Sequence, residues 1–207
     1  MTVNLTFRPA TVAESDLLAD MVLGDEQQVT TQVAMRLYGI ERLDVARALF
    51  RVTWRAAENW QRSVIASRES EPVGMIQTGM SSMKVTPGLA LAALRALGPG
   101  ALLRLPGRLR IQRRVSPAKP PGAYVVAELH VAPASRGQGI GEAMLAHAEA
   151  DARGRGFDEM ALHTLTNNPA RRLYERCGFS VVETRVDPDF RRLTGADGNV
   201  LLVKALA

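Results

Sequence analysis

The chain has 207 residues, 46% of them hydrophobic and 23% charged, with one cysteine and a net charge of +5. These values exclude a disordered chain and a disulfide-stapled secreted domain, and they allow one sizeable hydrophobic core. No stretch has the length and apolarity expected of a signal peptide or a membrane span, so we expect a cytoplasmic protein with a single domain over residues 1–207.

The positive charge is concentrated in one part of the sequence. Residues 72–127 contain eight Lys and Arg residues and no Asp or Glu, whereas the rest of the chain has a small excess of acidic residues. A basic segment of this kind attracts phosphate, an anionic membrane surface or an acidic substrate through its summed electric field.

The first third of the chain predicts a short strand followed by helices. Residues 5–8 have a strand-like pattern that Pro9 ends, and Thr11 and Glu14 have the spacing of a helix-capping box. Apolar residues then recur at helical spacing between residues 17 and 60. The period changes at residues 63–76, where two apolar runs flank a polar turn and predict a hairpin.

Residues 81–123 form a basic insertion that is punctuated by glycine and proline. Its leucine- and arginine-rich pieces predict short amphipathic helices that end in a loop. We expect the insertion to form a lid over an acceptor site or a dimer contact, with a membrane-surface helix and a solvated face as alternatives. Because it has no interleaved aromatic residues, we expect no nucleic-acid binding.

The last third predicts alternating strands and helices. A strand at 124–131 is followed by a glycine-rich turn and a helix at 140–153. Further elements are expected as a strand at 157–165, a helix at 168–177, a strand at 181–186, a polar loop, and a final strand at 199–205. The fold class is therefore α/β, with a mixed, partly parallel central sheet and helices on both faces.

The glycine-rich turn reads Arg136-Gly137-Gln138-Gly139-Ile140-Gly141. Its three glycines remove side chains that would block a ligand, and the helix that follows offers unpaired N–H groups and a partial positive charge. We expect the turn to bind a diphosphate, and a flexible turn that binds nothing is the alternative. Its pattern differs from the Walker loop and from the dinucleotide-binding fingerprint.

Two motifs in this region resemble those of the GNAT family of N-acyltransferases. They are the Arg-x-x-Gly-x-Gly turn at 136–141 and the Asn-x-x-Ala-x-x-Leu-Tyr-x-x-x-Gly-Phe stretch at 167–179. The resemblance is strong over residues 124–183 and weak over 20–60 and 81–123. It implies that a diphosphate lies on the turn and that the pantetheine arm of acetyl-CoA pairs with the preceding strand, in an opening where two parallel strands splay.

The resemblance also assigns individual residues to acetyl-CoA binding. These are Leu129, Val131, Arg136, Gly137, Gln138, Gly139, Ile140, Gly141 and Asn167. It places an oxyanion-binding backbone N–H near Leu129 or His130, and it places Tyr174 beside the leaving thiolate. The alternative for Tyr174 is a packed aromatic residue on the apolar stripe of its helix.

Two residues of one expected strand are candidates for the general base. Glu128 and His130 lie on the same face of the expected strand, and either one can deprotonate an ammonium group. His163 and His147 are further histidines that we expect to be structural. Cys177 lies on the apolar stripe with Tyr174, and we expect it to be packed rather than nucleophilic.

These observations together predict an acetyl-CoA-dependent N-acetyltransferase without a metal. Its acceptor would be a primary amine of a small molecule or a peptide, attacked directly, and the protein could form a homodimer. One alternative is a catalytically silent module that binds acyl-CoA for regulation or interaction. Another is a nucleic-acid binder built on residues 81–123, which would show steeply salt-dependent affinity.

Overall fold

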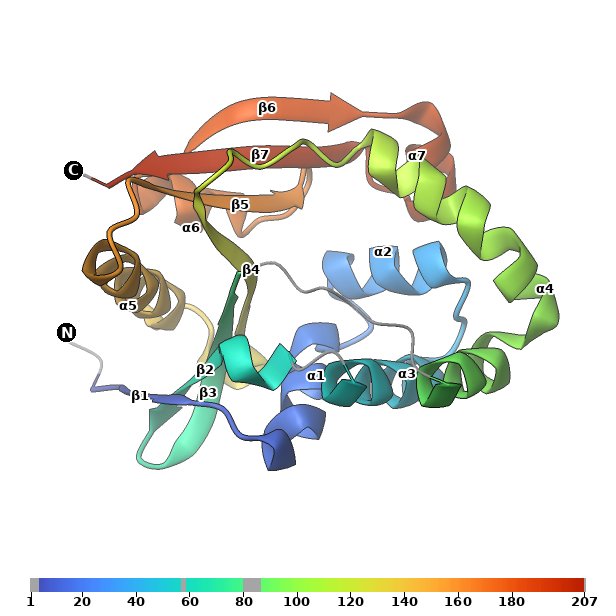
Figure 1. Ribbon diagram of the computed structural model, residues 1–207, viewed down its shortest axis with the longest axis horizontal. Helices are drawn as coiled ribbons and strands as arrows, with labels where there is room; N and C mark the ends of the chain where they lie inside the picture. Colours follow the sequence, from blue (N-terminus) through green and yellow to red (C-terminus); the bar gives the residue numbers. More distant parts are fainter. Residues whose placement is uncertain (1–3, 57–58, 80–86, 207) are drawn as a thin grey trace.

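A seven-stranded mixed sheet organises the protein in the computed structural model, which describes residues 4–56, 59–79 and 87–206 (Figure 1). The strand order is β1-β2-β3-β4-β5-β7-β6. The strands are β1 (Thr6–Pro9), β2 (Ser63–Arg68), β3 (Glu71–Thr78), β4 (Tyr124–Val131), β5 (Glu159–Leu165), β6 (Ser180–Val186) and β7 (Gly198–Ala205). Neighbours β4 and β5 run parallel, and the other neighbouring pairs are antiparallel.

Helices cover both faces of this sheet (Figure 1). They are α1 (Ser15–Leu23), α2 (Val29–Tyr38), α3 (Leu43–Ala56), α4 (Pro87–Arg114), α5 (Ile140–Gly154), α6 (Arg171–Arg176) and α7 (Pro188–Thr194), with 3-10 turns η1 (Val12–Glu14), η2 (Asn59–Arg62) and η3 (Pro133–Ser135). The α/β class, the mixed sheet and the helices on both faces agree with the prediction from the sequence.

Successive residues of β3 show how the two faces are separated. Ile76 packs with Met144 of α5 and with Leu162 of β5 in one buried cluster. Met75 packs with Leu18 of α1 and with other side chains on the opposite face. Because successive side chains of a strand point to opposite faces, one apolar strand supports both layers.

The basic insertion is helical, as predicted. Within the described residues, α4 consists of two helical segments that meet at a kink at Gly98, where φ is +69° and the backbone is not helical; residues 81–86 lie outside the described part. Contrary to the prediction, α4 is also long and apolar enough to cross a membrane by length and composition alone. Its Leu89 is buried against the α3 helix, and Leu97 packs on the same cluster.

The polar loop predicted before the last strand contains a helix, α7. The Asp187 carboxylate accepts hydrogen bonds from the backbone N–H groups of Asp189 and Phe190, at 2.8 and 3.0 Å. Pro188 occupies the first turn, Gly195 ends the helix, and the Phe190 side chain is buried. These are ordinary helix start and stop signals, so the prediction of a loop was wrong because it gave weight only to polarity.

Gly198 begins β7 where that strand meets the edge strand β6. A Cβ atom at Gly198 would lie 1.9 Å from the backbone oxygen of Arg185. We expect Gly198→Ala to lower the free energy of unfolding by about 3 kcal/mol or more, because the backbone of β6 would have to move. Urea denaturation measures this change. Gly154→Ala at the end of α5, with open space around its Cβ, is the control, and equal effects of both substitutions would contradict the expectation.

Candidate functional site

The parallel strands β4 and β5 separate partway along their length. Their pairing runs from Tyr124 opposite Met160 to Val126 opposite Leu162. Both strands continue, to Val131 and Leu165, without further pairing between them in this described stretch. Unpaired backbone N–H and C=O groups need partners, so the opening can accept an extended chain that carries amides.

A β-bulge in β4 decides which side chains face each side of the opening. Gln77 of β3 lies opposite Glu128, but the next residue, Thr78, lies opposite Val126, so Ala127 is the extra residue. An extra residue reverses the alternation of side chains along a strand. The bulge therefore changes the face to which the second half of β4 points.

Beyond the bulge, the two faces of β4 have different chemistry. Leu129 and Val131 pack on the cluster under α5. His130 lies opposite Met75, which belongs to the cluster on the other face, and Glu128 shares the face of His130. The apolar side chains thus face α5, and the titratable pair faces the helices α1 and α3.

The glycine-rich turn lies between β4 and α5. Gly137 and Gly139 have φ values of +74° and +77°, and Gly139 is the N-cap of α5. A Cβ at Gly137 would meet no atom within 4 Å, so this part of the turn borders open space. The first N–H groups of α5 have no partner within the helix, and together with the helix dipole they form a suitable environment for a diphosphate.

Gly141 also has a packing role. A Cβ at this buried position would lie 2.8 Å from Cδ2 of Leu173 in α6, so the glycine allows α5 and α6 to pack closely. The contact of its backbone with acetyl-CoA stays a prediction. The Ile140 side chain is also in the core, so only the backbone of this residue can contribute to binding.

Polar and basic side chains surround the turn. Arg136 is exposed, and its Nε donates to the backbone oxygen of Val131 at 3.3 Å. Gln138 accepts a hydrogen bond from Arg68 at the end of β2. No local sequence signal indicates Arg68, because 70 residues separate it from Gln138 and only the sheet brings them together.

Asn167 and its neighbour Asn168 differ in their surroundings. The Asn168 side chain accepts from the backbone N–H of Ala170 at 3.0 Å and donates to Thr164 Oγ1 at 2.8 Å. It therefore orders the chain at the start of α6. Asn167 is exposed next to this turn, and its contact with acetyl-CoA stays a prediction.

Glu128 and His130 form a close pair. Nε2 of His130 lies 2.8 Å from Oε2 of Glu128. The side chain of His130 is 13% exposed and that of Glu128 is 39% exposed, so the pair is partly shielded yet still accessible. A carboxylate that orients an imidazole is an arrangement able to take a proton from an ammonium group.

The charge of Glu128 acts on groups from three other segments. Burial raises the pKa of Tyr38 in α2, and Glu128 raises it further. Burial likewise raises the pKa of Tyr174 in α6, with a smaller contribution from Glu128. Burial lowers the pKa of Lys119, and Glu128 opposes that shift. The charge of Glu128 thus influences Tyr38 and Lys119 as well as Tyr174, and no local sequence signal indicated the first two.

Tyr174 is a packed aromatic residue of the cluster under α5. It is 7% exposed, and its ring centroid lies 6.3 Å from that of Phe179 in an edge-on arrangement. Because its raised pKa makes the phenol a weaker acid, Tyr174 is suited to donate a hydrogen bond rather than to release its proton. Burial also raises the pKa of the Cys177 thiol, which agrees with a packing role.

The other two histidines lie in apolar or buried surroundings. Burial, followed by the charge of Lys119, lowers the pKa of His163 to about 4, so its imidazole is neutral near pH 7. His163 comes directly after Leu162, the last residue of β5 that pairs with β4, and its buried Nε2 has no hydrogen-bond partner among the described residues. His147 stacks on Phe7, with ring centroids 4.4 Å apart.

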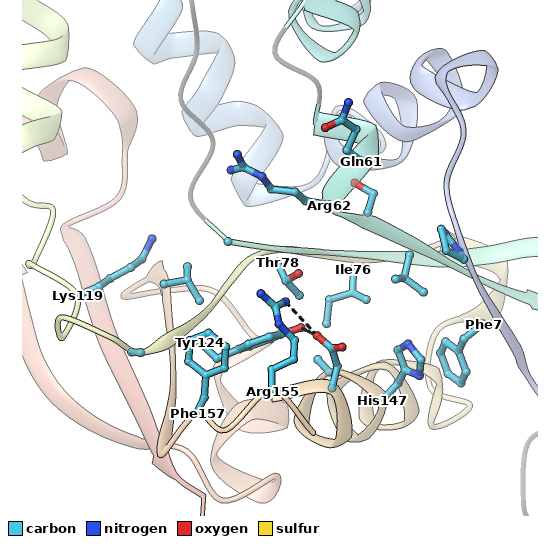
Figure 2. Close-up of a pocket in the computed structure, with 18 of the residues that line it drawn as sticks. Phe7, Gln61, Arg62, Ile76, Thr78, Lys119, Tyr124, His147, Arg155 and Phe157 are labelled. Atoms are coloured by element: carbon cyan, nitrogen blue, oxygen red, sulfur yellow. Dashed lines mark hydrogen bonds and ion pairs between the residues drawn. The ribbon is translucent and has the colours of Figure 1, made fainter. Parts of the chain in front are cut away.

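A cavity lies elsewhere, near the opposite end of α5 (Figure 2). It has a volume of about 800 Å³, and none of the predicted site residues lines it. The Tyr124 hydroxyl donates to Asp151 at 2.7 Å, and the Arg155 guanidinium lies 5.7 Å from the Tyr124 ring and 5.4 Å from the Phe157 ring. These groups satisfy one another, so size alone does not identify the functional site.

Comparison with known protein families supports the motifs found in the sequence. The model of the acetyltransferase (GNAT) family matches residues 32–179. No protein among the curated sequences matches this chain. Within the described residues, no group of three His, Cys, Asp or Glu side chains is placed to hold a metal ion.

Several solved structures share the fold over nearly the whole of both chains. One is a Corynebacterium glutamicum protein named 'histone acetyltransferase HPA2 and related acetyltransferase'. It is 20% identical to this chain, with a TM-score of 0.63, and the match covers 98% of this chain and 97% of that one. The arylalkylamine N-acetyltransferase 2 of Aedes aegypti is 15% identical, with a TM-score of 0.60 and coverage of 99% and 100%. The PaiA N-acetyltransferase of Thermoplasma acidophilum, in complex with coenzyme A, is 13% identical, with a TM-score of 0.56 and coverage of 98% and 99%.

Proposed function

Because this chain belongs to the GNAT family of acetyltransferases, which use acetyl-CoA, we propose that it transfers the acetyl group to a primary amine by direct attack. One observation carries this proposal. The open edge of β4 begins at the Glu128–His130 pair and leads to the glycine-rich turn, so the groups that the reaction needs lie along one strand.

The turn and the strand edge suit the two polar parts of acetyl-CoA. Backbone N–H groups at the start of α5 would bind the diphosphate, with Arg136 and Arg68 supplying positive charge at its rim. The open edge of β4 between Leu129 and Val131 would pair with the amides of the pantetheine arm. The apolar side chains of these two residues face the core, so they leave the backbone edge available.

The pair on the other face of β4 suits the attacking amine. Glu128 or His130 would take a proton from the ammonium group, which frees its lone pair to form the N–C bond. A backbone N–H near Leu129 or His130 would stabilise the oxyanion that develops on the carbonyl oxygen. The C–S bond then breaks with its electron pair on the leaving thiolate, which takes up the second proton that the nitrogen loses as the amide forms.

Tyr174 would stabilise that thiolate by a hydrogen bond. We expect Tyr174→Phe to lower kcat about tenfold, because one hydrogen bond to a charged group is lost, and to leave the Kd of acetyl-CoA unchanged. Tyr124→Phe is the matched control, since this tyrosine belongs to the same buried cluster but bonds to Asp151 outside the site. If Tyr174→Phe left kcat unchanged, or if Tyr174→Phe and Tyr124→Phe lowered kcat equally, Tyr174 would have a packing role only.

The release of free thiol from acetyl-CoA tests the proposed function. The protein is incubated with acetyl-CoA and a panel of small amines, amino acids and peptides, and the thiol is measured with a colorimetric reagent. We expect release above the background rate with at least one class of primary amine. Tight binding of acetyl-CoA without release for any acceptor would favour the catalytically silent module instead.

A further inference from the structure

A second cavity, of about 640 Å³, lies between the end of α2, the start of α3 and the middle of α4. Four arginines line it, and Glu41 is the one acidic residue among its described lining residues. The arginines are Arg36, Arg42, Arg104 and Arg108. None of the residues assigned above to acetyl transfer takes part, so the cavity is independent of the proposed function.

Two of these arginines are held in place by backbone oxygens. Arg36 Nη1 donates to the oxygen of Thr194 at 2.8 Å, and Arg108 Nη1 donates to the oxygen of Arg36 at 3.1 Å. A guanidinium group has five N–H donors, so each arginine keeps further donors for a ligand. The arrangement depends on Gly39, because a Cβ there would lie 2.3 Å from Arg108 Nη1.

The positive charge around the cavity is only partly compensated. Arg42 is paired with Asp44, and its Nε lies 3.0 Å from Oδ1 of that residue. Arg104 has no ion pair among the described residues. Even when Glu41 and Asp44 are both counted, the four arginines leave an excess of two positive charges. Like charges gathered in this way repel one another, and an anionic ligand would relieve the repulsion.

The rest of the lining is apolar. Val45 of α3, together with Leu97 and Ala101 on either side of the bend in α4, lines the cavity beside the arginines. Leu103 follows on α4 and is 84% exposed. We propose that this cavity binds a phosphate ester, with the arginines contacting the phosphate and the apolar side chains contacting the group that it carries. A soluble metabolite and the head group of a membrane lipid both supply this chemistry.

Calorimetric titration with inorganic pyrophosphate tests the proposal, with coenzyme A present at saturation so that the glycine-rich turn is filled. We expect wild-type protein to bind pyrophosphate and the double variant Arg42→Gln, Arg104→Gln to bind it at least about tenfold more weakly. This double variant keeps Arg36 and Arg108, so the backbone contacts of α2 and α7 stay intact. The affinity for acetyl-CoA is expected to be the same, which separates this test from that of the proposed function.

The matched control is the double variant Arg95→Gln, Arg110→Gln, which removes the same charge from exposed positions of α4 outside the cavity. We expect its affinity for pyrophosphate to stay within about twofold of wild type. The absence of pyrophosphate binding to the wild type, or an equal loss in both double variants, would overturn the proposal.

Sedimentation with lipid vesicles separates the two sources of the phosphate. If the ligand is a lipid head group, we expect the protein to sediment with vesicles of equal parts phosphatidylcholine and phosphatidylglycerol, but not with vesicles of phosphatidylcholine alone. The Arg42, Arg104 variant would then stay in the supernatant. A soluble ligand predicts pyrophosphate binding with no sedimentation on either vesicle. The proposed site would be contradicted if the Arg42, Arg104 variant still sedimented with the vesicles and the wild type bound no pyrophosphate in solution.

Discussion

Replacing Glu128 by glutamine is expected to lower kcat about a hundredfold while the Kd of acetyl-CoA stays unchanged. The substitution keeps the shape of the side chain, but the amide cannot take a proton from the attacking ammonium group and no longer stabilises a protonated His130 at 2.8 Å. Steady-state kinetics with the best amine from the thiol-release panel, together with calorimetry of acetyl-CoA, measures both quantities.

Glu183→Gln is the control for this prediction. Glu183 is also a partly buried strand glutamate with a close partner, Arg185 Nε at 2.6 Å, but it lies on β6 at the far edge of the sheet. Its substitution is expected to leave kcat unchanged. Full activity in Glu128→Gln, combined with a large loss in His130→Gln, would show that the imidazole accepts the proton and that the carboxylate is dispensable.

Replacing Gly137 by glutamate is expected to weaken acetyl-CoA binding at least about a hundredfold, because a carboxylate would project into the open space where we propose that the diphosphate binds. The like charges repel, and the added side chain also obstructs the N–H groups at the start of α5. Calorimetric titration of acetyl-CoA into the variant measures the loss.

Gly156→Glu provides a closely matched control. Gly156 follows the other end of α5 with a φ of +75°, against +74° for Gly137, and its Cβ would also meet no atom within 4 Å. Both substitutions therefore have about the same conformational cost and add the same charge. If both variants bound acetyl-CoA with the same affinity, whether equal to that of the wild type or weaker, the turn would not be the binding site of acetyl-CoA.

Much of the sheet could be predicted because its signals are local. The bounds of β4 match the predicted strand at 124–131, since a run of alternating and apolar residues ends at Pro133. The hairpin of β2 and β3 and the start of α5 at Ile140 also follow from turn and glycine patterns. The motifs at 136–141 and 167–179 then indicated the family that the comparison confirmed.

Other features depend on contacts between distant parts of the chain. The first helical segment of α4 packs on the cluster around α3 through Leu89 and Leu97, and no spacing in the sequence indicates this contact. The bulge at Ala127 is visible only in the pairing with β3. Arg68 comes from a separate strand, so no spacing in the sequence could place it beside the turn.

A crystal structure of the protein with coenzyme A bound would test the central claim most directly. We expect the diphosphate within hydrogen-bond distance of the backbone N–H groups of residues 137–141, the pantetheine arm along β4, and the sulfur beside Tyr174. Coenzyme A bound in the cavity of Figure 2, or an opening between β4 and β5 filled by side chains of the protein itself, would contradict this account.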